Sequence, residues 1–346
     1  MTSENEIQGK LLNLCHKEFP SRENLGIVDL TRIGDGWENY IYSFRMEYEK
    51  GGQPESQDLI LRIYPGDNAH EKSAREFSVM KRLHVATFPV PQVLLLGPDD
   101  KPFGRPFVIM ERIDGRLMGE VFSESPRRKR RELLTLFCKI FVDLHKLDWE
   151  PFVDDPSSSI GEDFDAFMKK KFSKWQDYFH SFKKDEFDPV FDWLNERSLS
   201  VRWSRPSLIH WDYHPWNILL RNDGAPFVID WTSAEVLDFR FDLAWTLLLI
   251  RTHTHRRMAR SVLNEYARIA GRRIEHLDFF EVAACARRLF SVSVSFSDGA
   301  ERIGMRPGAE AVMKESAGPL RQVYALLHHR TGIKIPEVET LLSDIS

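Results

Sequence analysis

The chain has few cysteines and no long apolar run, and both absences limit what it can be. Its three cysteines, Cys15, Cys138 and Cys285, stand far apart, which excludes a disulfide-rich scaffold and a cysteine-based metal site. No apolar stretch approaches the roughly 20 residues that a membrane-spanning helix needs. The N-terminus has neither the basic start nor the apolar core of a signal peptide. We therefore expect a cytoplasmic protein with reduced thiols and no membrane partner.

A strong charge bias is also absent. The 48 basic residues nearly balance the 52 acidic ones, and a net charge of −4 gives no case for a nucleic acid as partner. The hydrophobic share of 42% is ordinary for a globular protein, and 346 residues are enough for two lobes with separate cores. The composition leaves the oligomeric state open.

The most informative stretch is residues 208–231, which has the pattern of a loop, a short strand, a turn and a second short strand. Asp212 and Asn217 lie five residues apart in the loop, and Asp230 follows thirteen residues after Asn217. The turn at residues 222–224, Asn-Asp-Gly, predicts a tight hairpin that brings Asp230 back beside Asn217. We expect three oxygen-bearing side chains to converge there.

Two carboxylates and a carboxamide in this order suit phosphoryl transfer. Magnesium takes oxygen ligands, so Asp230 and Asn217 are the candidate metal ligands. Asp212 is the candidate base that accepts the proton of an attacking hydroxyl. Protein kinases have the same order of Asp, Asn and a second Asp beyond a hairpin. Each residue taken singly is more often a plain loop residue, so the joint spacing carries the interpretation.

The segment His-Trp-Asp-Tyr-His-Pro-Trp-Asn at 210–217, followed by Ile-Asp-Trp at 229–231, resembles the aminoglycoside phosphotransferase family. That family is a branch of the protein-kinase-like fold and is related to choline kinases. Its loop commonly reads His-Gly-Asp-x-x-x-x-Asn. Trp211 replaces the usual glycine and Trp216 a small residue, and both changes can narrow the acceptor site. The resemblance implies that Asp242 braces the loop through backbone N–H groups and that His210 is structural.

The resemblance also implies an α+β fold of two lobes, a small lobe with an antiparallel sheet and a larger, mainly helical lobe. We place the first lobe at 1–112, as a nucleotide-covering unit of five strands and a helix, and the second at 113–346. The second contains the catalytic loop 208–231 and a helical acceptor-site segment at 151–200. That segment is rich in aromatic residues and has a net charge of −4, and this charge bias is too small to decide whether the acceptor is a cationic or amphipathic alcohol. Later helices are expected at 256–270, 276–297, 308–331 and 336–344.

The first lobe supplies the expected nucleotide site. Strands are predicted at 27–33, 40–48, 58–64, 93–96 and 106–110, and a helix at 68–84. Gly34 and Gly36 resemble the family's nucleotide-covering loop, whose backbone N–H groups can cover phosphates. Arg62 occupies the place of the phosphate-binding lysine, and its planar fork can grip phosphate. The alternative interpretation is that Arg62 is an ordinary exposed arginine of the strand.

The predicted helix offers two partners for Arg62. Glu76 adjoins its apolar face and is the expected partner, while Glu71 falls on a different face. Further on, backbone groups around Met110 and Arg112 are expected to hold an adenine ring, as in the family's linker between lobes.

Five consecutive basic residues at 127–131 open the helix predicted over 126–147. A nuclear signal and an anion-binding patch are the functional interpretations, and a solvated helix end is the simpler one, which we favour.

Taken together, the residues and the resemblance predict an ATP-dependent small-molecule kinase that uses Mg²⁺. It would move the γ-phosphoryl group to the hydroxyl of a small-molecule alcohol. An antibiotic, a choline-like amine, a sugar and an amino alcohol all stay open as acceptors, as does GTP in place of ATP. The alternative class is a catalytically weak nucleotide-binding pseudokinase or binding protein on the same fold, and Arg62 is the feature that points to it.

Overall fold

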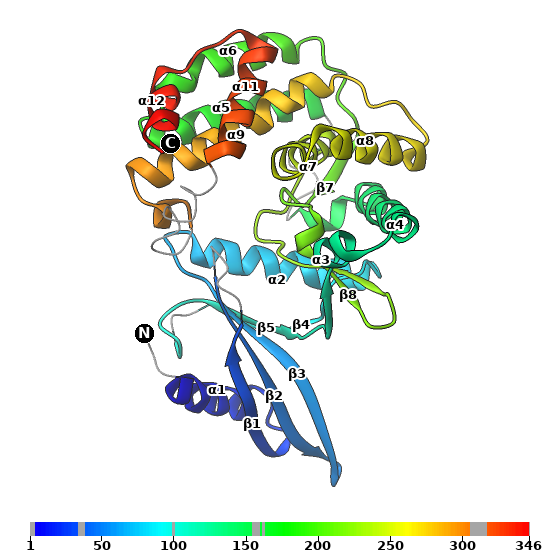
Figure 1. Cartoon of the computed structure of the whole chain (residues 1–346). Helices are drawn as coiled ribbons and strands as arrows, with labels where there is room; N and C mark the ends of the chain where they lie inside the picture. Colours follow the sequence, from blue (N-terminus) through cyan, green and yellow to red (C-terminus); the bar gives the residue numbers. More distant parts are fainter. Residues whose placement is uncertain are drawn as a thin grey trace. The chain divides into compact units, whose positions relative to one another are not determined.

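The computed structural model describes residues 4–33, 39–98, 101–153, 160, 163–304 and 317–345 (Figure 1). The chain divides into two compact, discontinuous units. The first joins Met1–Gly115 to Leu219–Thr232 and Ala300–Ala309, and the second contains Arg116–Ile218, Ser233–Gly299 and Glu310–Ser346. A single lobe boundary after residue 112 stays a prediction, since the first unit also takes in the segment that ends the motif at 208–231.

The first unit is built on an antiparallel sheet of five strands in the order β1-β2-β3-β5-β4. β2 and β3 pair without a register shift from Tyr40 opposite Ile63 to Lys50 opposite Gln53. The turn that joins them, Gly51-Gly52, takes positive φ at both residues, a conformation that glycine adopts at little cost. The strand bounds are β1 (Glu23–Arg32), β2 (Tyr40–Lys50), β3 (Gln53–Ile63), β4 (Val93–Gly97) and β5 (Phe107–Glu111).

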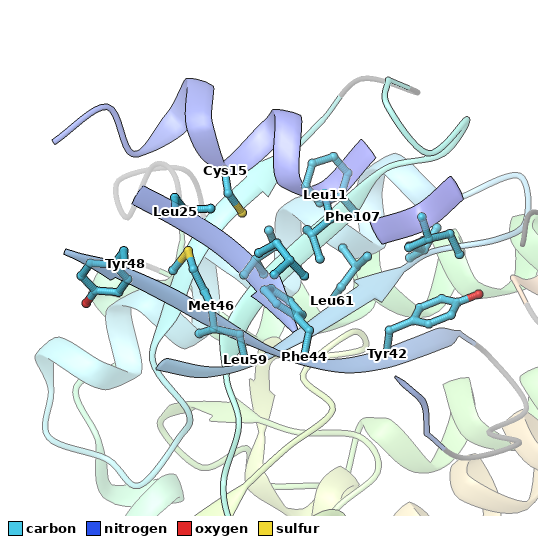
Figure 2. Close-up of a cluster of buried hydrophobic side chains, with 14 residues drawn as sticks. Leu11, Cys15, Leu25, Tyr42, Phe44, Met46, Tyr48, Leu59, Leu61 and Phe107 are labelled. Carbon is cyan, nitrogen blue, oxygen red and sulfur yellow. The ribbon is translucent and has the colours of Figure 1, made fainter. Parts of the chain in front are cut away.

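One face of this sheet forms a hydrophobic core with α1 (Glu4–Glu18), as Figure 2 shows. Strand alternation puts every second side chain of β2 and β3 on that face, among them Phe44 and Leu61. The helix contributes Leu11, which is fully buried. Residues one step out of this alternation point to the opposite face, where α2 (Ala69–Val85) packs against β4 and β5.

The first unit also contains most of a short hairpin, β8 (Ile218–Arg221) and β9 (Pro226–Val228). Its turn is closed by the Arg221 N–H, which donates to the Ala225 carbonyl at 2.9 Å, and Gly224 takes φ +86°. Gly115, the first residue of β6 (Gly115–Leu117), lies against this hairpin. A Cβ atom at Gly115 would stand 2.3 Å from the Leu220 carbonyl oxygen, so the close approach of the two backbones requires glycine.

The second unit is mainly helical, and among its described residues β7 (Pro206–Ile209) pairs with β10 (Glu235–Asp238) in an antiparallel ladder. The α+β class with an antiparallel sheet and a helical remainder is therefore confirmed. Of the helix expected at 308–331, residues 317–331 lie in the described part. The helices are α3 (Met118–Glu124), α4 (Arg127–Lys146), α5 (Phe164–Ser181), α6 (Asp188–Ser198), α7 (Phe239–His253), α8 (Arg256–Ala270), α9 (Leu277–Ser297), α11 (Ala317–Thr331) and α12 (Pro336–Asp344). None of them is long and apolar enough to cross a membrane.

The basic run at 127–131 is exposed on the first turns of α4. Arg128 forms an ion pair with Glu132, and Arg130 donates to the carbonyls of Phe122 and Ser123 at the end of α3. A cation at a helix C-terminus is favourable because the helix dipole is negative there. These local contacts fit the simpler interpretation of a solvated helix end.

The core under α1 gives a prediction about stability. Leu11→Ala should lower the free energy of unfolding by about 2–5 kcal/mol, because it removes buried methyl groups and leaves a cavity. The matched control is Leu199→Ala, since Leu199 is 76% exposed and its loss should cost under about 0.5 kcal/mol. Urea unfolding followed by fluorescence measures both, and equal shifts would contradict this core.

Candidate functional site

The first unit holds a buried charged group centred on Arg62. Because the alternate residues of β3 face the α1 core, Arg62 points to the other face of the sheet. Its side chain is only 8% exposed. The alternative of an exposed strand arginine is therefore wrong.

The guanidinium of Arg62 donates in three directions. Nη1 donates to Glu76 Oε1 and Nη2 to Asp230 Oδ1, each at 2.9 Å. The amide oxygen of Asn39, with the amide oriented to face the guanidinium, accepts from Nη2 at 2.6 Å and from Nε at 3.0 Å. The two carboxylates raise the pKa of Arg62 against the opposing effect of burial, so this cation stays charged.

Glu76 is the partner that the sequence predicted, and it is fully buried on α2. Its carboxylate also accepts from the Tyr64 hydroxyl and, at 3.0 Å, from the backbone N–H of Trp231. Burial raises the pKa of Glu76, and the charge of Arg62 opposes that rise. Glu71 forms an ion pair with Arg75 instead. The alternative pairing of Arg62 with Glu71 is therefore wrong.

Asp230 follows β9 in an unusual backbone conformation. Its φ is +70°, a left-handed region that costs a non-glycine residue about 1–3 kcal/mol and that is found most often at functional sites. The surrounding contacts hold it there, since Thr232 Oγ1 donates to Asp230 Oδ1 at 3.0 Å. The next residue, Trp231, is fully buried and its indole N–H donates to the Val228 carbonyl at 3.1 Å.

Each of the two units holds one of the candidate metal ligands. Asp230 offers a carboxylate and Asn217 a carboxamide, which are ligand types that Mg²⁺ accepts. Within the described residues, no group of three His, Cys, Asp or Glu side chains forms a metal cluster of its own.

The other nucleotide-site candidates of the first unit are two glycines and two residues at the end of β5. Gly34 and Gly36 lie outside the described residues. Met110 is buried in β5, opposite Ile60 in the strand register, and the Arg112 N–H donates to the Asp58 carbonyl at 3.0 Å. The Glu111 N–H donates to the Gln92 carbonyl at 2.8 Å. Both of these N–H groups are therefore already bonded within the sheet.

The second unit holds Asp212 in a loop that Asp242 braces. The backbone N–H groups of His210 and Trp211 donate to the Asp242 carboxylate at 2.7 and 2.9 Å. Asp242 lies in the first turn of α7 and is fully buried, and His145 Nε2 lies 3.3 Å from its Oδ2. The brace implied by the family resemblance is thus present in the geometry.

His210 orders the same loop through its ring. It is fully buried, and its Nδ1 accepts from the backbone N–H of Asp212 at 3.2 Å. This bond fixes the backbone between His210 and Asp212, which fits a structural role for His210.

Three side chains surround the Asp212 carboxylate. The indole N–H of Trp245 donates to Oδ1 at 3.2 Å, the amide of Asn217 donates to Oδ2 at 3.0 Å, and His214 Nε2 lies 3.3 Å from Oδ2. Burial alone would raise the pKa of Asp212, but His214 and the other donors outweigh it and hold the pKa well below its usual range. Asp212 is therefore an ionised acceptor at neutral pH.

Asn217 ends the short 3₁₀ turn Pro215–Asn217. Its amide nitrogen donates to both the carbonyl and the carboxylate of Asp212, at 2.9 and 3.0 Å. Since the amide oxygen lies on the opposite side of the same carbon, it points away from Asp212. That orientation suits a metal ligand, while the predicted proximity of Asn217 to Asp230 stays a prediction.

The two tryptophans that depart from the family loop lie in different environments. Trp211 is 4% exposed with φ +64°, and its indole N–H donates to Glu235 Oε1 at 2.6 Å. Trp216 is 54% exposed, and its ring lies so close to α3 that a Cβ atom on Gly119 would stand 2.7 Å from it. The first tryptophan is therefore part of the core behind the loop.

Several residues that form hydrogen bonds with the candidate site residues were not predicted from the sequence. Asn39, Tyr64 and Trp245 each donate to or accept from a candidate site residue, yet none belongs to a motif. Asn39 directly precedes the strand Tyr40–Lys50, so its position after the glycine turn was the one available signal. Trp245 lies three residues after Asp242 on α7, which puts both on one helix face.

The buried Arg62 group gives a second prediction. Arg62→Ala should lower the free energy of unfolding by about 3–5 kcal/mol, because it leaves Glu76 buried without its counter-ion. Arg62→Lys should recover part of that loss, since a lysine cannot reproduce the planar fork.

The control for this prediction is Arg45→Ala on β2. Arg45 forms an exposed pair with Asp58 at 2.9 Å, and such a pair is worth about 0–1 kcal/mol. Urea unfolding of all four proteins checks the comparison, and similar losses for the two alanine variants would refute the buried group as a source of stability.

Comparison with known proteins places the chain in a family. Residues 29–277 match the model of the phosphotransferase enzyme family. Acyl-CoA dehydrogenase family member 10 of Mus musculus is 25% identical over 64% of this chain and 20% of its own length. Member 11 of Gallus gallus is 25% identical over 67% of this chain and 29% of its own length. The chain thus spans less than a third of these relatives.

Solved structures share the fold at low identity. A thermostable mutant of aminoglycoside phosphotransferase APH(4)-Ia aligns with a TM-score of 0.60 and 17% identity, covering 93% of this chain and all of that one. The GDP complex of an aminoglycoside 2'-phosphotransferase-IIIa mutant aligns with a TM-score of 0.55 and 16% identity, covering 94% and 97%. The resemblance found in the sequence is confirmed, and the chain belongs to the phosphotransferase enzyme family, with the protein-kinase-like fold of the aminoglycoside phosphotransferases.

Proposed function

We propose that this protein transfers the γ-phosphoryl group of ATP, with Mg²⁺, to a hydroxyl group of a small molecule. The observation that carries the proposal is the state of Asp212. A carboxylate that is held ionised, braced by Asp242 and oriented by Asn217 and Trp245 is prepared to accept a hydroxyl proton. Solved relatives of the same fold were captured with GDP, ADP or AMP-PNP, which supports a nucleotide as donor.

The first unit supplies the nucleotide side of this proposal. In this proposal Arg62 positions the phosphates while Glu76 fixes its guanidinium. Asp230 and Asn217 would hold Mg²⁺, which when bound neutralises charge on the phosphates. Since the N–H groups of Glu111 and Arg112 are bonded to the Gln92 and Asp58 carbonyls, an adenine ring at the Met110–Arg112 linker would use other backbone groups of this stretch.

The chemical step then needs little more than positioning. The acceptor oxygen forms a bond to the γ-phosphorus as the bond from that phosphorus to the β-phosphate oxygen breaks, and ADP leaves with that electron pair. The hydroxyl proton passes to the Asp212 carboxylate. Asn217 and Trp245 keep that carboxylate directed, because each donates to a different one of its oxygens.

A second candidate function is a nucleotide-binding pseudokinase, which one observation favours. Asp230 Oδ1 already accepts from Arg62 and Thr232, so a metal would share this carboxylate with a resident cation. Such sharing lowers metal affinity and could leave a protein that binds a nucleotide without turnover. A cytoplasmic location fits either function, because the three cysteines are buried free thiols.

Asp212 gives the direct test of catalysis. Asp212→Asn should lower turnover by about 10²–10⁴-fold while leaving nucleotide affinity near that of the wild type, because only the proton acceptor is lost. ADP release measures turnover, and calorimetry measures affinity for magnesium-ATP. Asp223→Asn in the exposed β8–β9 turn is the matched control.

The reciprocal variant separates the roles of the two aspartates. Asp230→Ala should abolish the magnesium dependence of nucleotide binding, because the carboxylate anchor is gone. Undiminished turnover in Asp212→Asn would contradict the role of Asp212 as the base, whereas a wild-type protein that binds magnesium-ATP without any turnover would be the pseudokinase.

The contact of His214 with Asp212 gives a pH prediction. Because His214 lowers the pKa of Asp212 against the opposing effect of burial, the wild-type base stays ionised to a lower pH than a free aspartate, and activity that depends on this carboxylate is lost only at that lower pH. In His214→Ala, burial is less opposed and the pKa of Asp212 rises. The acid limb of the kcat/KM profile should therefore move to higher pH. His180→Ala, an exposed histidine paired with Asp188, should leave the limb in place.

A further inference from the structure

The second unit contains a small cavity beside the residues that brace the catalytic loop. It is lined by residues at the C-terminal ends of α4 and α8 and just before β7, and α4 packs against both α8 and β7 (Figure 1). Its volume is about 210 Å³, which is below the roughly 300–1,000 Å³ of pockets that take drug-sized ligands. The cavity therefore suits a ligand of only a few heavy atoms.

The base of the cavity is ordered, because its polar atoms are already bonded. His145 Nε2 lies 3.3 Å from Asp242 Oδ2, and His145 Nδ1 lies 2.8 Å from the hydroxyl oxygen of Tyr266. Both His145 and Tyr266 line the cavity, and both are buried. A ligand must therefore be bound chiefly by the other polar side chains of the lining.

Those other polar side chains are three cations, Lys146, Arg205 and Arg272. Arg205 is held at the end of α4, where its Nη2 donates to the carbonyls of His145 and Leu147 at 3.2 and 3.3 Å. Arg272 is held by stacking, since its guanidinium carbon lies 4.3 Å from the ring centre of Phe239. Both contacts fix a guanidinium in place without neutralising its charge.

No carboxylate compensates these three cations among the residues that the structure describes. None lines the cavity, and none forms an ion pair with any of the three side chains. Asp143 on α4 and Glu265 on α8 each form an ion pair on their own helix. Asp148, which follows α4, accepts from the backbone N–H of Glu150. The acidic side chains of this region therefore have other partners.

The two helix ends at the cavity offset part of the positive charge. A helix C-terminus is equivalent to about −0.5 of an elementary charge, so α4 and α8 together contribute about −1 and leave about +2. A phosphate group carries about −1.5 to −2 at pH 7, whereas a carboxylate carries a single charge. The charge of the cavity thus matches a phosphate better than a carboxylate.

We infer that this cavity binds a small phosphate-bearing anion, which is inorganic phosphate or a short phosphate monoester. The three cations contact the phosphate oxygens, and the buried His145 and Tyr266 form the base of the site. Arginine presents its N–H groups in a planar fork that matches the oxygens of a phosphate. Because Asp212 does not line the cavity, the inference holds whether or not the protein is a kinase.

The experiment is a calorimetric titration of the whole chain with inorganic phosphate, methyl phosphate and acetate at one ionic strength. AMP-PNP and Mg²⁺ are present at saturation, so that the proposed nucleotide site does not take up the added anion. We expect phosphate to bind saturably and acetate to bind at least about tenfold more weakly, since a charge-assisted hydrogen bond is worth about 10–100-fold. The tighter of the two phosphates shows whether the ligand is the free ion or a monoester.

Variants then test the assignment to the cavity. Lys146→Gln and Arg272→Gln should each weaken phosphate binding by about tenfold to a hundredfold, and Lys146→Arg should keep most of it. Arg205 is left intact because its bonds hold the end of α4. Arg260→Gln, which removes an exposed cation from α8, is the matched control and should have no effect.

Hydrogen exchange locates the bound anion on the chain. Phosphate should slow the exchange of backbone amides at 142–147 and 266–272 in the wild type, and should not do so in the double variant of Lys146 and Arg272. Phosphate affinity that is unchanged in both single variants, or protection confined to other segments, would overturn the inference. Equal affinity for acetate, or no saturable binding of either phosphate, would overturn it as well.

Discussion

The buried charge of Arg62 is the constraint on which the first unit depends. Its guanidinium joins a strand of the sheet, helix α2 through Glu76 and the segment after β9 through Asp230. A cation with 8% of its side chain exposed is tolerable only if carboxylates and hydrogen-bond acceptors surround it, and each of these partners has further bonds of its own. Asp230, the candidate metal ligand, is therefore ordered by the same contact that orders Arg62, the proposed phosphate-binding residue.

An arginine suits this arrangement in a way that a lysine would not. Its planar fork directs separate N–H groups at Glu76, Asp230 and Asn39, whereas an ammonium is a point charge on a flexible stem. The replacement of the family's lysine is thus matched by the acceptors around it, which argues against random loss of a catalytic residue. It also means that Asp230 is neutralised by a protein cation before any Mg²⁺ arrives.

The sequence predicted those parts of the molecule that depend on local periodicity or on short spacings. Apolar alternation predicted the five strands, the 3.6-residue period predicted helices such as 256–270 and 336–344, and the predicted helix over 68–84 favoured Glu76 over Glu71. Contacts between distant segments were out of reach, because no local pattern encodes them. The bond between Arg62 and Asp230 spans 168 residues, and that between Trp245 and Asp212 spans 33. The contact of Arg287 in α9 with the Trp211 carbonyl spans 76 residues and was missed for the same reason.

The tryptophan in place of the family's glycine is held by several side chains, among them Arg287 of α9. A φ of +64° strains the backbone of Trp211 by about 1–3 kcal/mol, whereas a glycine would adopt it without strain. The contacts of Trp211 must therefore offset that strain. They are its backbone N–H to Asp242, its indole N–H to Glu235 and the stacked guanidinium of Arg287. A glycine would offer neither the indole donor nor the ring. The tryptophan therefore links Glu235 and Arg287 to the loop that carries Asp212. The charged groups near the proposed base thus depend on the residue that directly precedes it in the sequence.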